Sequence, residues 1–474
     1  MPTTQLLSKL SLPLLDFSTA KGDKIDITLA PVAQRIRALR FGRRCREFKS
    51  LRGRHVWKAT HMDNSLITQA DKVFSDFFKR EIYLDQPYAI KDLDYSERLI
   101  TEFKSLLPLI PKDAPAETET GIVTRELERI CSFFIDTLEE SLTSKTTEPM
   151  EIVARFQIEP SDIEAIRHWL KANRQAVVKA NTEQMEKSNG DRRTSIPAGS
   201  RELRRKAEDI LTGCIEDLKA LAVEALGMEE LSALLSEFTV SIDSVSTRAT
   251  SNRISKVALV SLQGCVYMSK GSIYVDVARL IKEFAHEVVG HCLNYYLTEH
   301  SKLPIFVKEN FYLDTSSTRE SVSDHMERYF FAACMERSKK LSSNPHFYQL
   351  EEEYTNFSNI SLLEKYYRYL ESLGIWVLAT SKMDDHRLQT EKLEQYSIEP
   401  KWVSWFINRH RNNWDRSTGL LLPSVVSDLR YSLESVDKQI SKRKPKDMLK
   451  FHRAVLTGCW TPKGFENWVD LTGY

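Results

Sequence analysis

Two histidines and a glutamate stand together in the middle of this 474-residue chain, in the six-residue run HEVVGH that extends from His286 to His291. Imidazoles are common zinc ligands, and a carboxylate beside them can accept a proton from water at the metal. In the common zinc-protease pattern the two histidines are four residues apart and share one face of an α-helix. Here they are five residues apart, so an ideal helix would turn their rings about 140° away from each other. A single π-type turn closes that gap, and Gly290 tolerates the looser backbone.

The motif needs a helix to carry it, and the surrounding sequence predicts one that follows a strand. Residues 272–277 alternate in the manner of a half-buried strand. Apolar residues then recur at helical spacing, namely Leu280, Ile281, Phe284, Ala285, Val288, Val289 and Leu293. We therefore expect a core helix over about residues 278–298. The alternative is that the motif supplies two core histidines and a surface glutamate, with no metal between them.

A third ligand must come from a separate element downstream. The next strong helical pattern is expected over about residues 317–338, and it places Glu320 as the natural ligand. Asp324 lies one turn later on the same face. Ser317 and Glu320 also have the spacing of a capping box, in which the glutamate satisfies a backbone amide at the helix start. Spacing alone leaves both interpretations of Glu320 open.

The stretch from about residue 238 to 330 resembles the microtubule-associated tyrosine carboxypeptidases and their bacterial relatives, which are often described by a Gln-Glu-Gly-Leu-Ala motif. In that family a strand pair leads into a helix with two histidine ligands, and a later glutamate completes a His-His-Glu zinc site. The resemblance implies that His286 and His291 are zinc ligands, with Glu320 as the third ligand. It implies that Glu287 is the catalytic glutamate.

The chain also departs from the family pattern. It has Val-Gly at residues 289–290 where the family favours Gly-Thr, and Arg-Glu-Ser-Val-Ser at residues 319–323 where the family favours Gln-Glu-Gly-Leu-Ala. The four metal-site residues are kept, and Glu327 matches a further acidic position of the family. We therefore expect zinc chemistry, whereas the choice of substrate stays open because residues next to a ligand line the pocket.

A second match lies near the C-terminus, where Arg409, Arg411 and Tyr431 resemble the Arg-rich segment and the Asp-x-x-Tyr element of the family. A carboxypeptidase needs a cation that grips the terminal carboxylate of its substrate, and arginine does so through paired hydrogen bonds. The resemblance thus implies that Arg409 and Arg411, with Arg430 as a further candidate, bind substrate beside Tyr431. The alternative for each arginine is ordinary surface charge.

Together these features predict an α+β protein that is predominantly helical, with a zinc-peptidase-like core. Alternation at residues 238–242 and a further apolar run at 257–262 predict strands of a small β-sheet that precedes the metal-binding helix. The expected activity is that of a metallocarboxypeptidase with one Zn²⁺ per chain, which removes a C-terminal residue, tyrosine by resemblance, from a protein or peptide. The alternatives are a zinc endopeptidase of the same fold and an inactive relative that acts as a protein-binding module.

Composition sets the broad class. Hydrophobic residues make up 42% and charged residues 28% of the chain, as in ordinary soluble globular proteins. No apolar run approaches the roughly 18 residues of a membrane span, and the N-terminus lacks the pattern of a secretory signal. The seven cysteines are scattered without a Cys-x-x-Cys pair, so we expect reduced core thiols and a cytoplasmic location. Cys292, next to His291, is an alternative thiolate ligand, although the spacing and the family favour a carboxylate.

We expect a helical N-terminal region over residues 1–115 and a catalytic domain over residues 116–474. From Arg35 to Lys58 there are ten arginines or lysines and one acid, Glu47. Such a basic block docks on acidic surfaces, for example an acidic protein tail such as that of tubulin, or it forms a solvated helix face. No nucleic-acid-binding module accompanies it, so a nucleic-acid partner is not expected.

Overall fold

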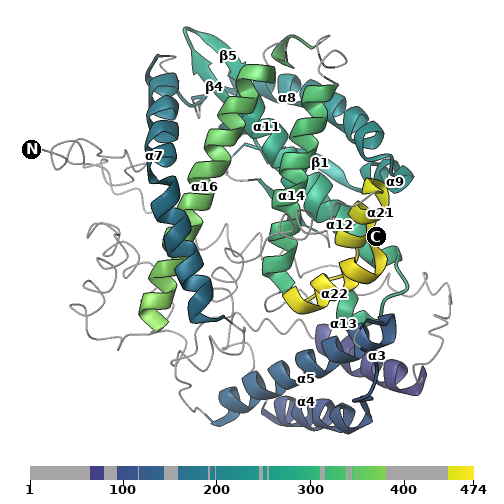
Figure 1. Ribbon diagram of the computed structural model, residues 1–474. Coiled ribbons are helices and arrows are strands. Elements are labelled where there is room, and N and C mark those ends of the chain that lie inside the picture. Colours follow the sequence, from purple (N-terminus) through teal and green to yellow (C-terminus); the bar gives the residue numbers. More distant parts are fainter. Residues whose placement is uncertain are drawn as a thin grey trace, which may run out of the picture. The chain divides into compact units, whose positions relative to one another are not determined.

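The described part of the chain is predominantly helical, as predicted, and it carries two small sheets (Figure 1). All of it belongs to one compact unit that extends from His55 to Tyr474. No helix of this part is both long and apolar enough to cross a membrane. The computed structural model describes residues 64–79, 93–115, 117–143, 158–190, 193–197, 199–244, 249–252, 256–309, 315–337, 341, 344–347, 350–379 and 447–473.

Three helices near the N-terminus, α3 (Asn64–Lys79), α4 (Leu93–Leu106) and α5 (Glu119–Thr143), share one aromatic core. Its members are fully buried phenylalanines, and each ring centroid lies 4.6–5.6 Å from that of at least one other member: Phe74, Phe77, Phe103, Phe134, and Phe306 of the short helix α13 (Ile305–Lys308). The carboxylate of Asp71 also accepts a hydrogen bond of 2.7 Å from the backbone N–H of Ile305. These helices are thereby joined to the segment that follows the HEVVGH run. The expected division at residue 115 stays a prediction.

The long helices α7 (Pro160–Gly190) and α16 (Leu350–Ala379) lie side by side (Figure 1). Lys187 forms a 3.1 Å ion pair with Glu353, and the rings of Trp169 and Tyr369 meet edge to face with centroids 4.9 Å apart. Helices α8 (Arg201–Leu226) and α9 (Glu229–Glu237) follow α7 in the sequence. Two short 3₁₀ turns lie elsewhere in the chain: η2 (Leu107–Leu109) follows α4, and η4 (Pro345–Phe347) precedes α16.

Strands lie at the three places that the sequence predicted, the structure adds two that it did not (β2 and β4), and together they form two sheets and not one. In the first sheet β3 (Val257–Ser261) is central, parallel to β1 (Thr239–Asp243) and antiparallel to β2 (Thr250–Asn252). The short helix α10 (Leu262–Cys265) then leads into a hairpin of β4 (Val266–Ser269) and β5 (Ser272–Val275). Its two loop residues, Lys270 and Gly271, have positive φ angles of 49° and 80°, as a type I′ turn requires.

A single continuous helical rod carries the HEVVGH run. It consists of α11 (Val277–Phe284), the π-helical segment η3 (Ala285–Cys292) and α12 (Leu293–His300). Asp276 caps its start by accepting a 3.1 Å hydrogen bond from the backbone N–H of Arg279. The buried carboxylate of Glu283 accepts hydrogen bonds from the backbone of Ser261 in β3 and from Arg279, so the first sheet is fixed to the rod.

The C-terminal helices α21 (Met448–Val455) and α22 (Pro462–Thr472) return to this core. Asn294 of α12 donates a 2.9 Å hydrogen bond to the carbonyl of Leu456. Glu126 of α5, which is 3% exposed, accepts hydrogen bonds from the backbone N–H and the hydroxyl of Thr461 at the start of α22. A carboxylate at a helix N-terminus is favourable because the helix dipole and the first backbone N–H groups both attract it. The six cysteines in the described residues are all buried thiols, as predicted.

Two buried histidines join α21 to α14 (Thr315–Glu336), the helix that carries Glu320. The Nε2 atoms of His325 and His452 are 3.3 Å apart, and the two residues are 6% and 1% exposed. In such a contact one ring donates its N–H and the other accepts. Burial, together with His325, lowers the pKa of His452 to about 3.

This pair predicts a pH dependence of stability. An unfolded histidine has a pKa of about 6.5, so between about pH 6.5 and pH 3 the unfolded chain is protonated at His452 while the folded chain is not. We expect His452 to reduce the free energy of unfolding by up to about 1.4 kcal/mol for each unit by which the pH falls in this range. Denaturant titrations at several pH values give the free energy of unfolding as a function of pH. This free energy should fall less steeply with falling pH in His452→Gln than in the wild type, and an equally steep fall would contradict the assignment. His300→Gln, at an exposed histidine, is the matched control.

Candidate metal centre

The π-helix predicted from the five-residue spacing is present over Ala285–Cys292. Its wider turn brings the rings of His286 and His291 to the same side of the rod. Their centroids are 4.8 Å apart and their planes are nearly perpendicular, at 84°. The unusual spacing is therefore compatible with two ligands that converge on one point.

Gly290 is needed for space. A Cβ atom at this position would lie 2.8 Å from the Cα atom of Ser323 in α14, which is closer than real Cβ atoms approach any backbone atom. The sequence interpretation gave this glycine a conformational reason, whereas the structure gives a steric one. Because Gly290 has no side chain, α14 packs directly against the π-helical segment. The hydroxyl of Ser323 then lies 3.1 Å from Nδ1 of His291.

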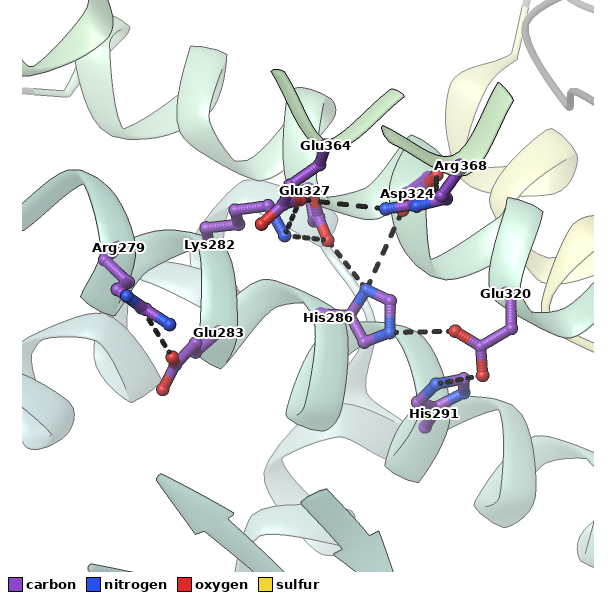
Figure 2. Close-up of polar contacts among 10 residues, drawn as sticks. All are labelled: Arg279, Lys282, Glu283, His286, His291, Glu320, Asp324, Glu327, Glu364 and Arg368. Carbon is purple, nitrogen blue, oxygen red and sulfur yellow. Dashed lines mark hydrogen bonds and ion pairs between the residues drawn. The ribbon is translucent and has the colours of Figure 1, made fainter. Parts of the chain in front are cut away.

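This packing places Glu320 between the two histidines (Figure 2). One carboxylate oxygen of Glu320 is 3.2 Å from Nε2 of His286, and the other is 3.2 Å from Nε2 of His291. Since α14 begins at Thr315, Ser317 lies inside the helix and not at its cap. The capping-box interpretation of Glu320 is therefore wrong.

The three side chains fit a zinc ion. Their ligand atoms all lie within 4.8 Å of one another. Tetrahedral zinc with bonds of about 2.0–2.2 Å has ligand-to-ligand edges of about 3.3–3.5 Å. The 3.2 Å separations between Glu320 and each ring are close to that edge. Two imidazoles and one carboxylate also form the ligand set of catalytic zinc sites, which keep a fourth position for water or substrate. The side chain of Glu320 is 37% exposed, so the centre reaches solvent on that side.

Glu327 orients His286 from the opposite side of the ring. Its carboxylate lies 2.7 Å from Nδ1 of His286 and is almost wholly buried. When Nδ1 carries the proton and donates a hydrogen bond to Glu327, Nε2 keeps its lone pair for a metal. The resemblance to the carboxypeptidase family gave Glu327 only as a matching acidic position, and the structure supplies a physical role for it.

A chain of ion pairs continues from Glu327 to α16 (Figure 2). Lys282 lies 3.0 Å from Glu327 and 2.9 Å from Glu364, so it bridges the two carboxylates. Arg368 forms a 2.7 Å pair with Asp324, whose carboxylate is 3.9 Å from Nδ1 of His286. Asp324, the second ligand candidate from the sequence, thus lies on the Nδ1 side of the ring.

His286, Asp324 and Glu327 also converge closely enough to hold a metal. However, both carboxylates of this group already pair with cations of the protein, so they are better suited to orient His286 than to bind an ion. Sequence reasoning missed Lys282, Glu364 and Arg368. No local pattern marks them, because only the packing of α16 against α11 and α14 brings them together.

Contacts among His286, His291, Glu320 and Glu327 shift the pKa values of His286 and Glu320. Burial opposes a charge on His286, but hydrogen bonds to Glu320 and Glu327 outweigh it and raise the pKa of the imidazole well above its usual value. Burial likewise opposes a charge on Glu320, yet His291 and His286 outweigh it and lower the pKa of the carboxyl well below its usual value. Glu320 is therefore an ionised carboxylate, the form that binds a cation. Protons would compete with a metal ion for the same ring nitrogens, so we expect the affinity of these side chains for a metal ion to fall as the pH falls.

Glu287 follows His286 in the sequence but belongs to neither of the groups of described side chains that could hold a metal ion. The residue is 8% exposed and forms no hydrogen bond or ion pair with any other described residue. Cys292 is buried, burial raises the pKa of its thiol, and it belongs to neither group of described side chains that could hold a metal ion. Arg409, Arg411, Arg430 and Tyr431 lie outside the described residues, as does the basic block from Arg35 to Lys58.

No model of a known protein family, no curated protein and no solved structure matches this chain. The functional argument therefore depends on the residues themselves.

Gly290→Ala is expected to lower the free energy of unfolding by about 1–3 kcal/mol, the usual cost of overpacking a core, because the new methyl group collides with backbone of α14. Gly213→Ala is the matched control, since a Cβ there meets no atom within 4 Å and an exposed helical Gly-to-Ala change adds up to about 1 kcal/mol. Chemical denaturation of both variants measures the difference. Equal effects of the two substitutions would contradict the close helix contact.

Glu327→Gln is expected to weaken zinc binding by about 10- to 100-fold, because the amide orients His286 less firmly than the carboxylate does. Competition with a zinc chelator measures the affinity. Glu336→Gln changes an exposed glutamate of the same helix and should leave the affinity unchanged. Equal affinities of the Glu327 variant and the wild type would show that this carboxylate does not support the ligand.

Proposed function

We propose that this protein is a zinc-dependent metallocarboxypeptidase with a zinc-peptidase-like core, which removes a C-terminal residue from a protein or peptide. Tyrosine is the residue implied by the resemblance to the microtubule-associated tyrosine carboxypeptidases. The observation that carries the proposal is the position of the Glu320 carboxylate, with one oxygen 3.2 Å from each Nε2 atom of His286 and His291. This arrangement supports one zinc ion per chain.

In this proposal each side chain has one task. His286, His291 and Glu320 hold the metal, and Glu327 keeps the ring of His286 in the orientation that a ligand needs. Zinc, when bound, supplies Lewis acidity, which polarises a peptide carbonyl and acidifies water.

Glu287 is the general base that takes a proton from water and returns it to the amine of the departing residue. Within the described chain its carboxylate has no hydrogen-bond or ion-pair partner to compete for that proton. A positioned acid–base group of this kind contributes typically about 10²–10⁴-fold to the rate.

An endopeptidase of the same fold uses the same ligands and the same base, so the metal site itself does not separate the two activities. An inactive relative that acts as a binding module is the other alternative. The intact ligand set and the position of Glu287 favour an enzyme. A carboxypeptidase differs from an endopeptidase by a cation that binds the terminal carboxylate, for which Arg409, Arg411 and Arg430 are the candidates from the sequence.

Elemental analysis tests the metal first. Wild-type protein should contain about one zinc per chain, and His291→Ala and Glu320→Ala should each lose it, because two remaining ligands hold zinc weakly. Glu299→Ala is the control, because Glu299 is an exposed residue of the helix that follows His291, and this variant should retain the metal. Wild-type protein without zinc after loading would contradict the proposal.

Glu287→Gln should keep the zinc and lose hydrolysis of a C-terminal residue by about 10²-fold or more, because the amide cannot accept a proton. Release of the terminal amino acid from a short acidic peptide ending in tyrosine, followed by chromatography, measures the rate. Undiminished release by this variant would rule out the role of Glu287.

A further inference from the structure

Arg319 and Tyr295 form a pair directly beside the proposed zinc ligands. Arg319 precedes Glu320 in α14, and Tyr295 follows His291 by one helical turn in α12. The guanidinium carbon of Arg319 lies 4.6 Å from the centroid of the Tyr295 ring, and its Nη2 donates a hydrogen bond to the Tyr295 hydroxyl. The ring of Tyr295 is in turn nearly parallel to that of His291, at 17°, with centroids 6.3 Å apart.

The pair holds a permanent positive charge close to the metal centre. A guanidinium does not lose its proton in proteins, and the side chain of Arg319 is half-buried, so its charge is only partly screened by water. Contact with an aromatic ring restricts where the guanidinium lies. Because Arg319 and Tyr295 belong to the helices that carry Glu320 and His291, their distance from the metal is set by the same packing.

This position suits a substrate carboxylate. When the scissile carbonyl lies at the metal, the terminal carboxylate of the departing residue is only one residue away, and consecutive Cα atoms are about 3.8 Å apart. The cation that binds this carboxylate must therefore come from the immediate surroundings of the ligands. Arg319 meets that condition, and a guanidinium pairs with a carboxylate through two parallel hydrogen bonds.

We propose that Arg319, positioned by Tyr295, binds a carboxylate group of the substrate and thereby determines which peptides the site accepts. This inference rests on the proposed peptidase function and identifies a cation for it within the described chain. The family that the sequence resembles favours glutamine at this position, so carboxylate binding by Arg319 is a property of this chain. The carboxylate comes from the free C-terminus or from an acidic side chain beside the scissile bond.

Binding is measured on the full-length, zinc-loaded Glu287→Gln protein, which is expected to hold a peptide without cleaving it. The probe is a short acidic peptide ending in tyrosine, with either a free or an amidated C-terminus, and calorimetry gives both affinities. We expect the free acid to bind about 10- to 100-fold more tightly than the amide, the usual effect of a charge-assisted pair. Adding Arg319→Gln should remove this preference, and Arg319→Lys should retain part of it.

Arg328→Gln is the matched control, because Arg328 is an exposed arginine of the same helix. It should leave the preference for the free acid unchanged. A third peptide, amidated and with its glutamates replaced by glutamines, identifies the source of the carboxylate. If Arg319 binds an acidic side chain, Arg319→Gln weakens binding of the acidic amide but not of this neutral peptide.

Two results would overturn the inference. In the first, the Arg319→Gln variant keeps the full preference for the free acid and binds the acidic amide as tightly as the parent protein does. In the second, the parent protein binds all three peptides with equal affinity. Zinc content and thermal unfolding of the variant report whether it folds. If Arg319→Gln does not fold, Tyr295→Phe, which removes only the hydroxyl, should weaken binding of the free acid several-fold and spare the neutral peptide. If Tyr295→Phe binds the free-acid peptide as tightly as the parent protein does, the inference is likewise overturned.

The same titrations on metal-free protein separate this inference from the proposed function. Neither Arg319 nor Tyr295 is a metal ligand, so a preference for carboxylates that depends on Arg319 should persist when zinc is removed. A wild-type protein that takes up no zinc but shows this preference would contradict the peptidase and keep the carboxylate site. A zinc protein without the preference would keep the metal centre and contradict the carboxylate site.

Discussion

The contact between α14 and the π-helical segment is the constraint on which the candidate site depends. The two elements approach so closely at Gly290 and Ser323 that no side chain fits between them. This distance brings the Glu320 carboxylate to the level of both imidazoles and the Ser323 hydroxyl to the other nitrogen of His291. A wider separation would leave a helix with two histidines and a second helix with an acid, but no shared centre. The π-helix and the close contact are therefore two parts of one geometric solution, since the first aligns the rings and the second supplies the carboxylate.

Close packing also brings charges out of water, and the structure compensates each of them. Lys282 is half-buried between Glu327 and Glu364, and Arg368 pairs with Asp324. Breaking one partner out of such a network leaves an uncompensated charge, which is more costly than the net gain from the intact pair. The same network holds His286 in place, because Glu327 is shared between Lys282 and Nδ1 of the ring. Helix α16 therefore contributes to the candidate metal centre without providing one of its three candidate ligands.

Hydrogen bonds hold the rod that carries the histidines on two sides, and a further contact fixes the C-terminal helix α22. Glu283 ties it to β3 through the backbone of Ser261, and Asn294 ties it to the carbonyl of Leu456 near the C-terminus. Glu126, from α5, caps the last helix through Thr461. Buried polar groups need partners of this kind, and each partner found here belongs to a different part of the chain. A catalytic constellation needs such support, because ligand geometry is lost when the elements that bear the ligands move relative to one another.

The sequence by itself determined the local features: the strand before the motif, the helix that bears it, the π-type turn between His286 and His291, and the helix that bears Glu320. Each follows from the spacing of residues near in sequence, because backbone hydrogen bonds and apolar periodicity act over a few residues. The sequence did not decide whether Glu320 caps a helix or faces the histidines, why residue 290 is glycine, or that Lys282, Glu364 and Arg368 support His286. It also did not separate the strands into two sheets. Those answers depend on which helices pack together and how closely, and contacts between residues far apart in the chain leave no periodic signal in a single sequence.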